Sequence, residues 1–209
     1  MQYRHFFWDF DGTLFDTYGR IARATVNALH ALGAAASFDQ VYPVVKRSLN
    51  TCYSTFAQPQ GIENDAFLAA YHAFSEREGP ESIQPYPGAR EALEAVIAGG
   101  GHNYLYTHRG ETAEKWLTWY GMNDLFADRV TSLDGFPSKP APDALNYLVN
   151  KHGLDKRDCV MIGDRDIDLD AGKNAGMACA LFDPEGFYPD YEADWRFDTM
   201  KDLAQVLCG

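Results

Sequence analysis

Between residues 103 and 182 the sequence alternates strand-like and helix-like segments, and this alternation restricts the possible fold more than any other feature. Short apolar segments over 103–106, 129–132, 159–162 and 178–182 indicate strands. Segments with helical spacing over 112–120, 142–152 and 166–175 separate them, and each is followed by a glycine that can end a helix. Repeated strand and helix predicts an α/β fold, a Rossmann-like parallel sheet with helices on both faces.

Residues 3–8 form a short aromatic run that predicts a further strand of the same sheet, because a lone buried strand could not pair its backbone N–H and C=O groups. The stretch that follows shows only helical spacing. Its expected helices run from Thr17 to Gly33, from Val41 to Tyr53 and from Phe67 to Phe74. We therefore expect an α/β core over 1–16 and 81–209, with an all-α cap inserted over 17–80.

The composition excludes several classes of function. The 209 residues include 18 Lys+Arg and 30 Asp+Glu, a net charge of -12, and no basic run is longer than Lys46-Arg47, so no nucleic-acid partner is expected. The apolar start is cut by Asp9 and is far shorter than the ~20 residues of a membrane span. The four cysteines match no zinc spacing and are expected to be reduced thiols. We expect a cytoplasmic protein with no membrane partner.

Polar residues follow the expected strands at their carboxyl ends, which is where open parallel sheets bind ligands. The four segments concerned are Asp9-Phe10-Asp11-Gly12-Thr13, Thr107-His108-Arg109, Ser138-Lys139-Pro140 and Gly163-Asp164, the last with Asp168 one helical turn further on. Four segments that are distant in sequence are therefore expected to meet in one crevice.

The charges in this crevice predict a bound cation. Two carboxylates 4 Å apart repel each other by about 4 kcal/mol at an effective dielectric constant of 20. An all-oxygen set of Asp9, Asp164 and Asp168, with no suitably spaced His or Cys, favours Mg²⁺. Lys139 adds a second positive charge and Thr107 a hydroxyl group, and together these groups suit a phosphoryl group.

These segments resemble the four ordered motifs of the haloacid dehalogenase-like hydrolase superfamily, particularly its phosphoglycolate phosphatase-like branch. The motifs are Asp9-Phe10-Asp11-Gly12-Thr13-Leu14, Thr107, Lys139-Pro140, and Gly163-Asp164 with Asp168. The resemblance extends from residue 1 to about 182, and the insertion matches that branch's helical cap in place and length. It implies a Mg²⁺-dependent phosphatase for a small phosphorylated metabolite. The sequence does not choose between a monomer and a homodimer.

The resemblance also implies roles for individual residues. Asp9 would be the nucleophile that forms an aspartyl-phosphate, and Asp11 the general acid and base, which requires a raised pKa. Mg²⁺ would be held by the Asp9 carboxylate, the Asp11 carbonyl and Asp164, with Asp168 acting through water or from behind these ligands.

The remaining motif residues would bind phosphate or shape the loop around it. Thr107 and Lys139 would bind the transferring phosphoryl oxygens. Gly12 permits a tight turn toward phosphate, and Thr13 can support that turn. His108 and Arg109 depart from the usual motif and either contact substrate or cover the crevice, and the role of Arg165 stays open.

Alternatives remain within and outside this family. Asp11 argues against dehalogenation and phosphonate cleavage, which need no acid at that position, but a β-phosphoglucomutase-like phosphomutase uses the same core residues. A non-enzymatic phospho-aspartyl switch is a more distant alternative. Taken singly, Thr107 could be a helix cap, Lys139 a solvated loop residue and Lys46-Arg47 a solvated helix face. The residues of the cap that select the substrate cannot be identified from helical spacing.

Overall fold

A computed structural model describes residues 2–208 and divides them into two compact units. One unit comprises the chain up to Phe15 and from Pro85 onward, and the other is Asp16–Gln84. The expected cap range, 17–80, lies within the second unit. The chain passes between the units at two short strands that pair with each other, β2 (Phe15–Asp16) and β3 (Gln84–Pro85).

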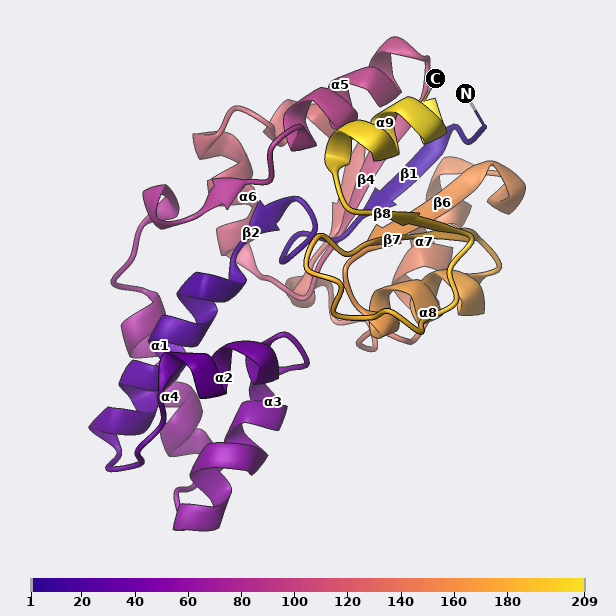
Figure 1. The fold of residues 1–209 in the computed structure, drawn as a ribbon. Helices are drawn as coiled ribbons and strands as arrows, with labels where there is room; N and C mark the ends of the chain where they lie inside the picture. The colour runs from indigo at the N-terminus through magenta and orange to yellow at the C-terminus, as the bar shows by residue number, and fades with distance from the viewer. Residues whose placement is uncertain (1, 209) are drawn as a thin grey trace. The chain divides into compact units, whose positions relative to one another are not determined.

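The first unit is built on a six-stranded parallel sheet with the strand order β5-β4-β1-β6-β7-β8 (Figure 1). In that order the strands are Asp128–Val130, His102–Tyr106, His5–Trp8, Cys159–Gly163, Ala178–Phe182 and Trp195–Phe197. The central strand β1 is fully buried over Phe6, Phe7 and Trp8, as expected for a parallel strand covered on both faces.

Helices cover both faces of this sheet, which confirms the predicted α/β fold. On one face, Leu145 of α7 (Asp143–His152) and Ala171 of α8 (Asp166–Ala175) share a core with Phe7, Tyr104 and Met161. On the other side lie α5 (Ala89–Ala98) and α9 (Met200–Cys208), which contact each other (Figure 1). The unit also contains α6 (Glu111–Trp119).

Two parts of the first unit differ from the sequence-based expectation. The strand expected over 129–132 corresponds to β5, Asp128–Val130, and ends earlier than expected. It ends there because the Thr131 hydroxyl accepts the Leu133 N–H at 3.3 Å and begins a 3₁₀ turn. The elements β8 and α9 were not predicted. The three-residue strand β8 is too short to show an alternating hydrophobic pattern. The start of α9 does carry a sequence signal, because Thr199 is a residue type that caps helices, and its hydroxyl accepts the Asp202 N–H at 3.1 Å.

The second unit is helical, with α1 (Tyr18–Ala31), α2 (Phe38–Val45), α3 (Leu49–Cys52) and α4 (Asn64–Ser75). The prediction of one helix from Val41 to Tyr53 is wrong, because α2 ends at Val45 and Ser48 starts a new helix. Ser48 is extended, and its hydroxyl accepts the Thr51 N–H at 2.9 Å. A π-helical turn, Tyr53–Ala57, follows α3.

No helix within residues 2–208 combines the length and the apolar character needed to cross a membrane. Cys52, Cys159 and Cys179 are buried free thiols, and burial raises the pKa of each to about 12.

Candidate active site

The register of the sheet places three sequence-predicted segments at one edge. Trp8 pairs with Leu105 on β4 and with Ile162 on β6, so the residues that follow these strands leave the sheet at the same level. The ladder continues one step further, because the Asp9 N–H donates to the Ile162 carbonyl at 2.9 Å. Asp9 is therefore held by the backbone of the sheet rather than by a loose loop.

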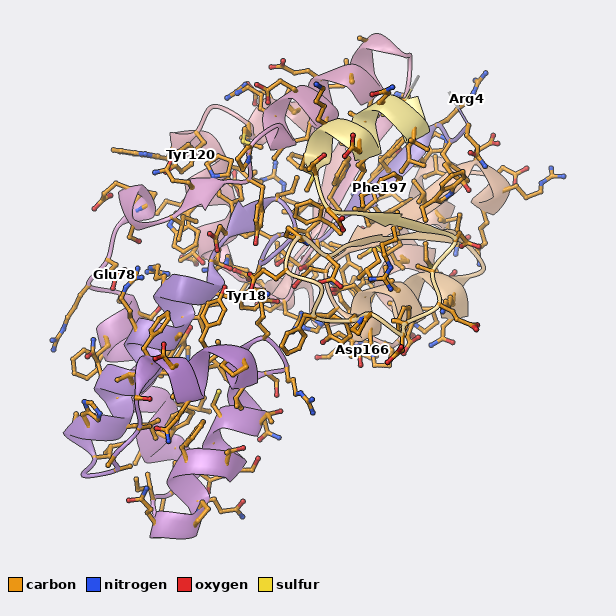
Figure 2. All side chains as sticks on the ribbon, in the orientation of Figure 1. Arg4, Tyr18, Glu78, Tyr120, Asp166 and Phe197 are labelled. Carbon is orange, nitrogen blue, oxygen red and sulfur yellow. The ribbon has the colours of Figure 1, made fainter. Side chains whose placement is uncertain are left out.

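A cluster of three buried carboxylates lies at this edge. Asp9, Asp164 and Asp168 each offer an oxygen, and these oxygens lie within 4.8 Å of one another. The three residues are 2 %, 8 % and 0 % exposed, although each carries an ionisable group. In Figure 2 the label of Asp166 marks the start of α8, the helix that carries Asp168.

Lys139 supplies the positive charge of the cluster. Its buried Nζ donates to Asp9 Oδ1 at 2.6 Å and to the Tyr106 carbonyl at 2.9 Å, and it lies 2.9 Å from Asp168 Oδ1. Two of the three ammonium hydrogens therefore donate to Asp9 and Tyr106, whereas Asp168 Oδ1 lies at ion-pair distance without a hydrogen bond in the described part of the chain. Burial by itself would lower the pKa of Lys139, but Asp168 and Asp9 raise it above the ordinary value, so the side chain stays charged.

The acids respond to this environment in opposite ways. Burial raises the pKa of Asp9, and Asp168 adds to that rise against the pull of Lys139. Burial also acts on Asp168, but Lys139 and Arg165 outweigh it and lower the pKa of Asp168. The difference follows from contacts, since Asp168 Oδ2 also accepts the Arg165 N–H at 3.1 Å.

The donor set fits a hard divalent cation. Asp9 Oδ2 is buried and has no hydrogen-bond partner among residues 2–208, which costs free energy unless a donor or cation faces it. The neighbouring acids offer only oxygen ligands, and these are the ligands that Mg²⁺ prefers.

The loop after β1 is tied to the loop after β6. Gly12 has a φ of 81°, a conformation that favours glycine, and its N–H donates to the Phe15 carbonyl at 2.8 Å. The Thr13 hydroxyl donates to Asp164 Oδ1 at 3.2 Å. Thr13 thus connects the first motif to the fourth.

Asp11 lies outside the three-acid cluster, and its carboxylate contacts Arg109. Arg109 Nε donates to Asp11 Oδ2 at 3.2 Å, and Nη2 forms an ion pair with Oδ1. The guanidinium also donates to Thr112 Oγ1 at 3.2 Å and lies 4.2 Å from the centre of the Trp116 ring. Sequence reasoning missed this pairing, because the two residues are 98 positions apart and no local pattern links them.

The Thr107 segment supports its neighbours. The Thr107 hydroxyl is buried and accepts the Arg109 N–H at 3.0 Å. His108 Nε2 accepts the Lys139 N–H at 3.0 Å, so this nitrogen carries no proton. Partial burial and the charge of Lys139 lower the pKa of His108. His108 therefore holds the Lys139 segment in place.

Arg165 lies beside the acid cluster. Its Nε is 3.7 Å from Asp168 Oδ2, and its backbone N–H donates to the same oxygen. The sequence carried a signal for the second contact, since an acidic side chain at the third helical position commonly turns back to the residue that precedes the helix.

Known proteins resemble this chain over most of its length. Residues 6–182 match the family model described as haloacid dehalogenase-like hydrolase. A phosphoglycolate phosphatase of Vibrio parahaemolyticus is 33% identical over 217 residues, covering 96% of this chain and 94% of the relative. A pyrophosphatase PpaX of Bacillus velezensis is 27% identical over 205 residues, covering 95% and 94%.

A solved structure shares the fold. It is described as a predicted phosphoglycolate phosphatase from Haemophilus somnus 129PT and aligns with a TM-score of 0.82 at 23% identity, covering 99% of this chain and 98% of that one.

Proposed function

Because this chain belongs to the haloacid dehalogenase-like hydrolases, we propose that it is a Mg²⁺-dependent phosphatase that hydrolyses a small phosphorylated metabolite through an aspartyl-phosphate. Relatives named as phosphatases and pyrophosphatases support the reaction class. The observation that carries the proposal is the environment of Asp9: a strand-end carboxylate that is buried beside Lys139, with Oδ2 left without a hydrogen bond.

In the proposed first step, an Asp9 oxygen attacks phosphorus and the bond from phosphorus to the ester oxygen breaks. Asp11 gives its proton to the leaving oxygen, which departs as an alcohol. In the second step a water oxygen attacks phosphorus, Asp11 takes a proton from that water, and the acyl-phosphate bond breaks. Inorganic phosphate is released, and the Asp9 carboxylate and the protonated Asp11 are restored.

The cation would be held by Asp9, Asp164 and the backbone carbonyl of Asp11, with Asp168 acting through water or behind these ligands. When bound, it supplies positive charge that stabilises the phosphoryl oxygens in the transition state. Lys139 would bind the same oxygens from the other side of the Asp9 carboxylate, and the Thr107 hydroxyl would donate to one of them. Thr13 would keep Asp164 oriented through its hydrogen bond.

The helical unit, Asp16–Gln84, is proposed to be a cap that excludes water during the transfer and selects the substrate. Its insertion directly after the Asp9–Leu14 motif supports this role, because the core supplies the reacting groups. The proposed setting is the cytoplasm, as a monomer or homodimer, and the buried free thiols suit a reducing compartment.

Replacement of Asp9 tests the proposal. Asp9→Asn should lower Mg²⁺-dependent phosphate release from an aryl phosphate ester by at least roughly a thousand-fold, because the nucleophile is lost. EDTA should abolish the activity of the unchanged protein. Asp155→Asn, at a 44 % exposed carboxylate, is the matched control and should keep full activity. Turnover by Asp9→Asn would remove Asp9 from the role of nucleophile, and isomerised sugar phosphate without free phosphate would favour a phosphomutase.

A further inference from the structure

Arg109 is held in place by contacts other than its ion pair with Asp11. Its Nη1 donates to Thr112, its guanidinium lies 4.2 Å from the Trp116 ring centre and 5.3 Å from that of Phe10, and its own N–H donates to Thr107. The Arg109 side chain is 12 % exposed. The guanidinium is therefore preorganised and would keep its position if Asp11 moved.

The pairing occupies both oxygens of Asp11. Nε donates to Oδ2 and Nη2 to Oδ1, so the planar guanidinium takes up the whole carboxylate. In the proposed reaction one of these oxygens must instead reach the ester oxygen. The two-point pairing with Arg109 favours the ionised carboxylate, whereas the first step needs Asp11 in its protonated form, so the pairing has to loosen before Asp11 can act as the acid.

Breaking that pairing leaves a charge that needs a partner. Among residues 2–208, Asp11 is the carboxylate within ion-pair distance of Arg109, and the other contacts of the guanidinium are a hydroxyl and two aromatic rings. A mostly buried cation that loses its anion is destabilised. A carboxylate or phosphoryl group has the geometry to take both vacated N–H donors.

We propose that Arg109 binds a second anionic group of the substrate, a carboxylate or a phosphoryl group close to the reacting ester, and that this group replaces Asp11 at the guanidinium. Arg109 is then a specificity-determining residue that couples recognition of the substrate to release of Asp11. This inference rests on the proposed phosphatase function and adds the class of substrate to it. A phosphate ester with a neutral tail cannot displace Asp11 in this way.

Selectivity between matched substrates tests the inference. Phosphoglycolate and hydroxyethyl phosphate have similar size, but one ends in a carboxylate and the other in an alcohol. Pyrophosphate is the third substrate, and its second anionic group is a phosphoryl group. We expect the unchanged protein to prefer one or both anionic substrates over hydroxyethyl phosphate by kcat/KM, and the preferred arm identifies the second anion. Arg109→Gln should reduce this preference about ten- to hundred-fold, the range of a charge-assisted hydrogen bond.

Two further variants show that the effect belongs to Arg109. Arg109→Lys keeps the charge but loses the two-point geometry, and should retain part of the preference. Arg129→Gln is the matched control, because Arg129 is also partly buried but pairs with Glu114 and Asn123. The substrate preference of this variant should equal that of the unchanged protein. If Arg109→Gln does not fold, the unchanged protein and Arg109→Lys still decide the question.

The outcomes separate this inference from the function on which it rests. Cleavage of all three substrates with similar kcat/KM, or an unaltered preference in Arg109→Gln, overturns the role of Arg109 and leaves the phosphatase proposal standing. Failure of the unchanged protein to release phosphate from any substrate, including an aryl phosphate ester, overturns both.

Discussion

Lys139 is the residue on which the charges of the candidate site depend. Its side chain is fully buried between Asp9 and Asp168, two carboxylates that would repel each other without it. The sequence predicted that Lys139 would face this crevice, because it follows the third expected strand. The contact with the Tyr106 carbonyl was not predictable, since a backbone oxygen leaves no mark in a sequence.

Removing this charge should destabilise the protein. We expect Lys139→Met to lower the free energy of unfolding by about 3–5 kcal/mol in EDTA, because two buried carboxylates lose their counter-charge. Lys151→Met is the control: Lys151 pairs with Asp128 on the surface, where ion pairs contribute little, so the loss should be much smaller. Urea unfolding measures both. Equal losses for the two variants would contradict this account of Lys139.

At the scale of elements, α8 brings Asp168 to the site by packing closely on β6 and β7. A Cβ placed at Gly172 of α8 would lie 2.7 Å from Cys179 Sγ and 2.7 Å from Met161 Cβ. Glycine is therefore required at this point of closest approach. The bounds of α8 and β7 agree with the expected ranges, 166–175 and 178–182, because both have strong local signals. The close contact at Gly172 involves side chains from two strands, β6 and β7, so no local sequence pattern predicts it.

Gly172→Ala should therefore lower the free energy of unfolding by about 1–3 kcal/mol, the usual cost of overpacking. Gly19→Ala in α1 should instead raise the free energy of unfolding. There the nearest atom is Arg23 Nη1 at 3.5 Å, an ordinary contact, and alanine favours helix by roughly 0.5–1 kcal/mol. Thermal or urea unfolding compares the two variants. A Gly172→Ala protein as stable as the unchanged one would show that α8 can move away from the sheet without cost.

At the scale of the whole molecule, a histidine cluster at the amino end of the sheet links stability to pH. His5 pairs with His102 across β1 and β4, and their rings stack with centroids 5.7 Å apart. His5 Nδ1 is buried and has no hydrogen-bond partner among residues 2–208. Burial, followed by the charge of His102, lowers the pKa of His5 despite the opposing effect of Asp158. The folded protein therefore resists protonation of His5 more than the unfolded chain does.

The sign of the pH dependence follows from this shift. When folding lowers the pKa of a group, the folded state keeps its full stability at pH values above the pKa of the unfolded chain, which is about 6.5 for His. Stability is lost as the pH falls below that value, because the unfolded chain then binds a proton more readily than the folded protein. We expect the urea midpoint to fall between about pH 7.5 and pH 5, and the fall to be shallower in His5→Asn. His72→Asn, at an exposed position in α4, is the control. A slope that His5→Asn leaves unaltered would assign the pH dependence to other groups.

The fold class and the edge of the sheet that holds the polar residues followed from local patterns. Alternating periods identify strands and helices, and parallel strands must end at a common edge, so Asp9, Lys139 and Asp164 could be placed there from the chain alone. The break at Ser48 and the pairing of Asp11 with Arg109 could not be predicted in this way. A single hydroxyl can replace a continuous helix with a new cap, and contacts between residues 98 positions apart exist only once the sheet has brought their loops together.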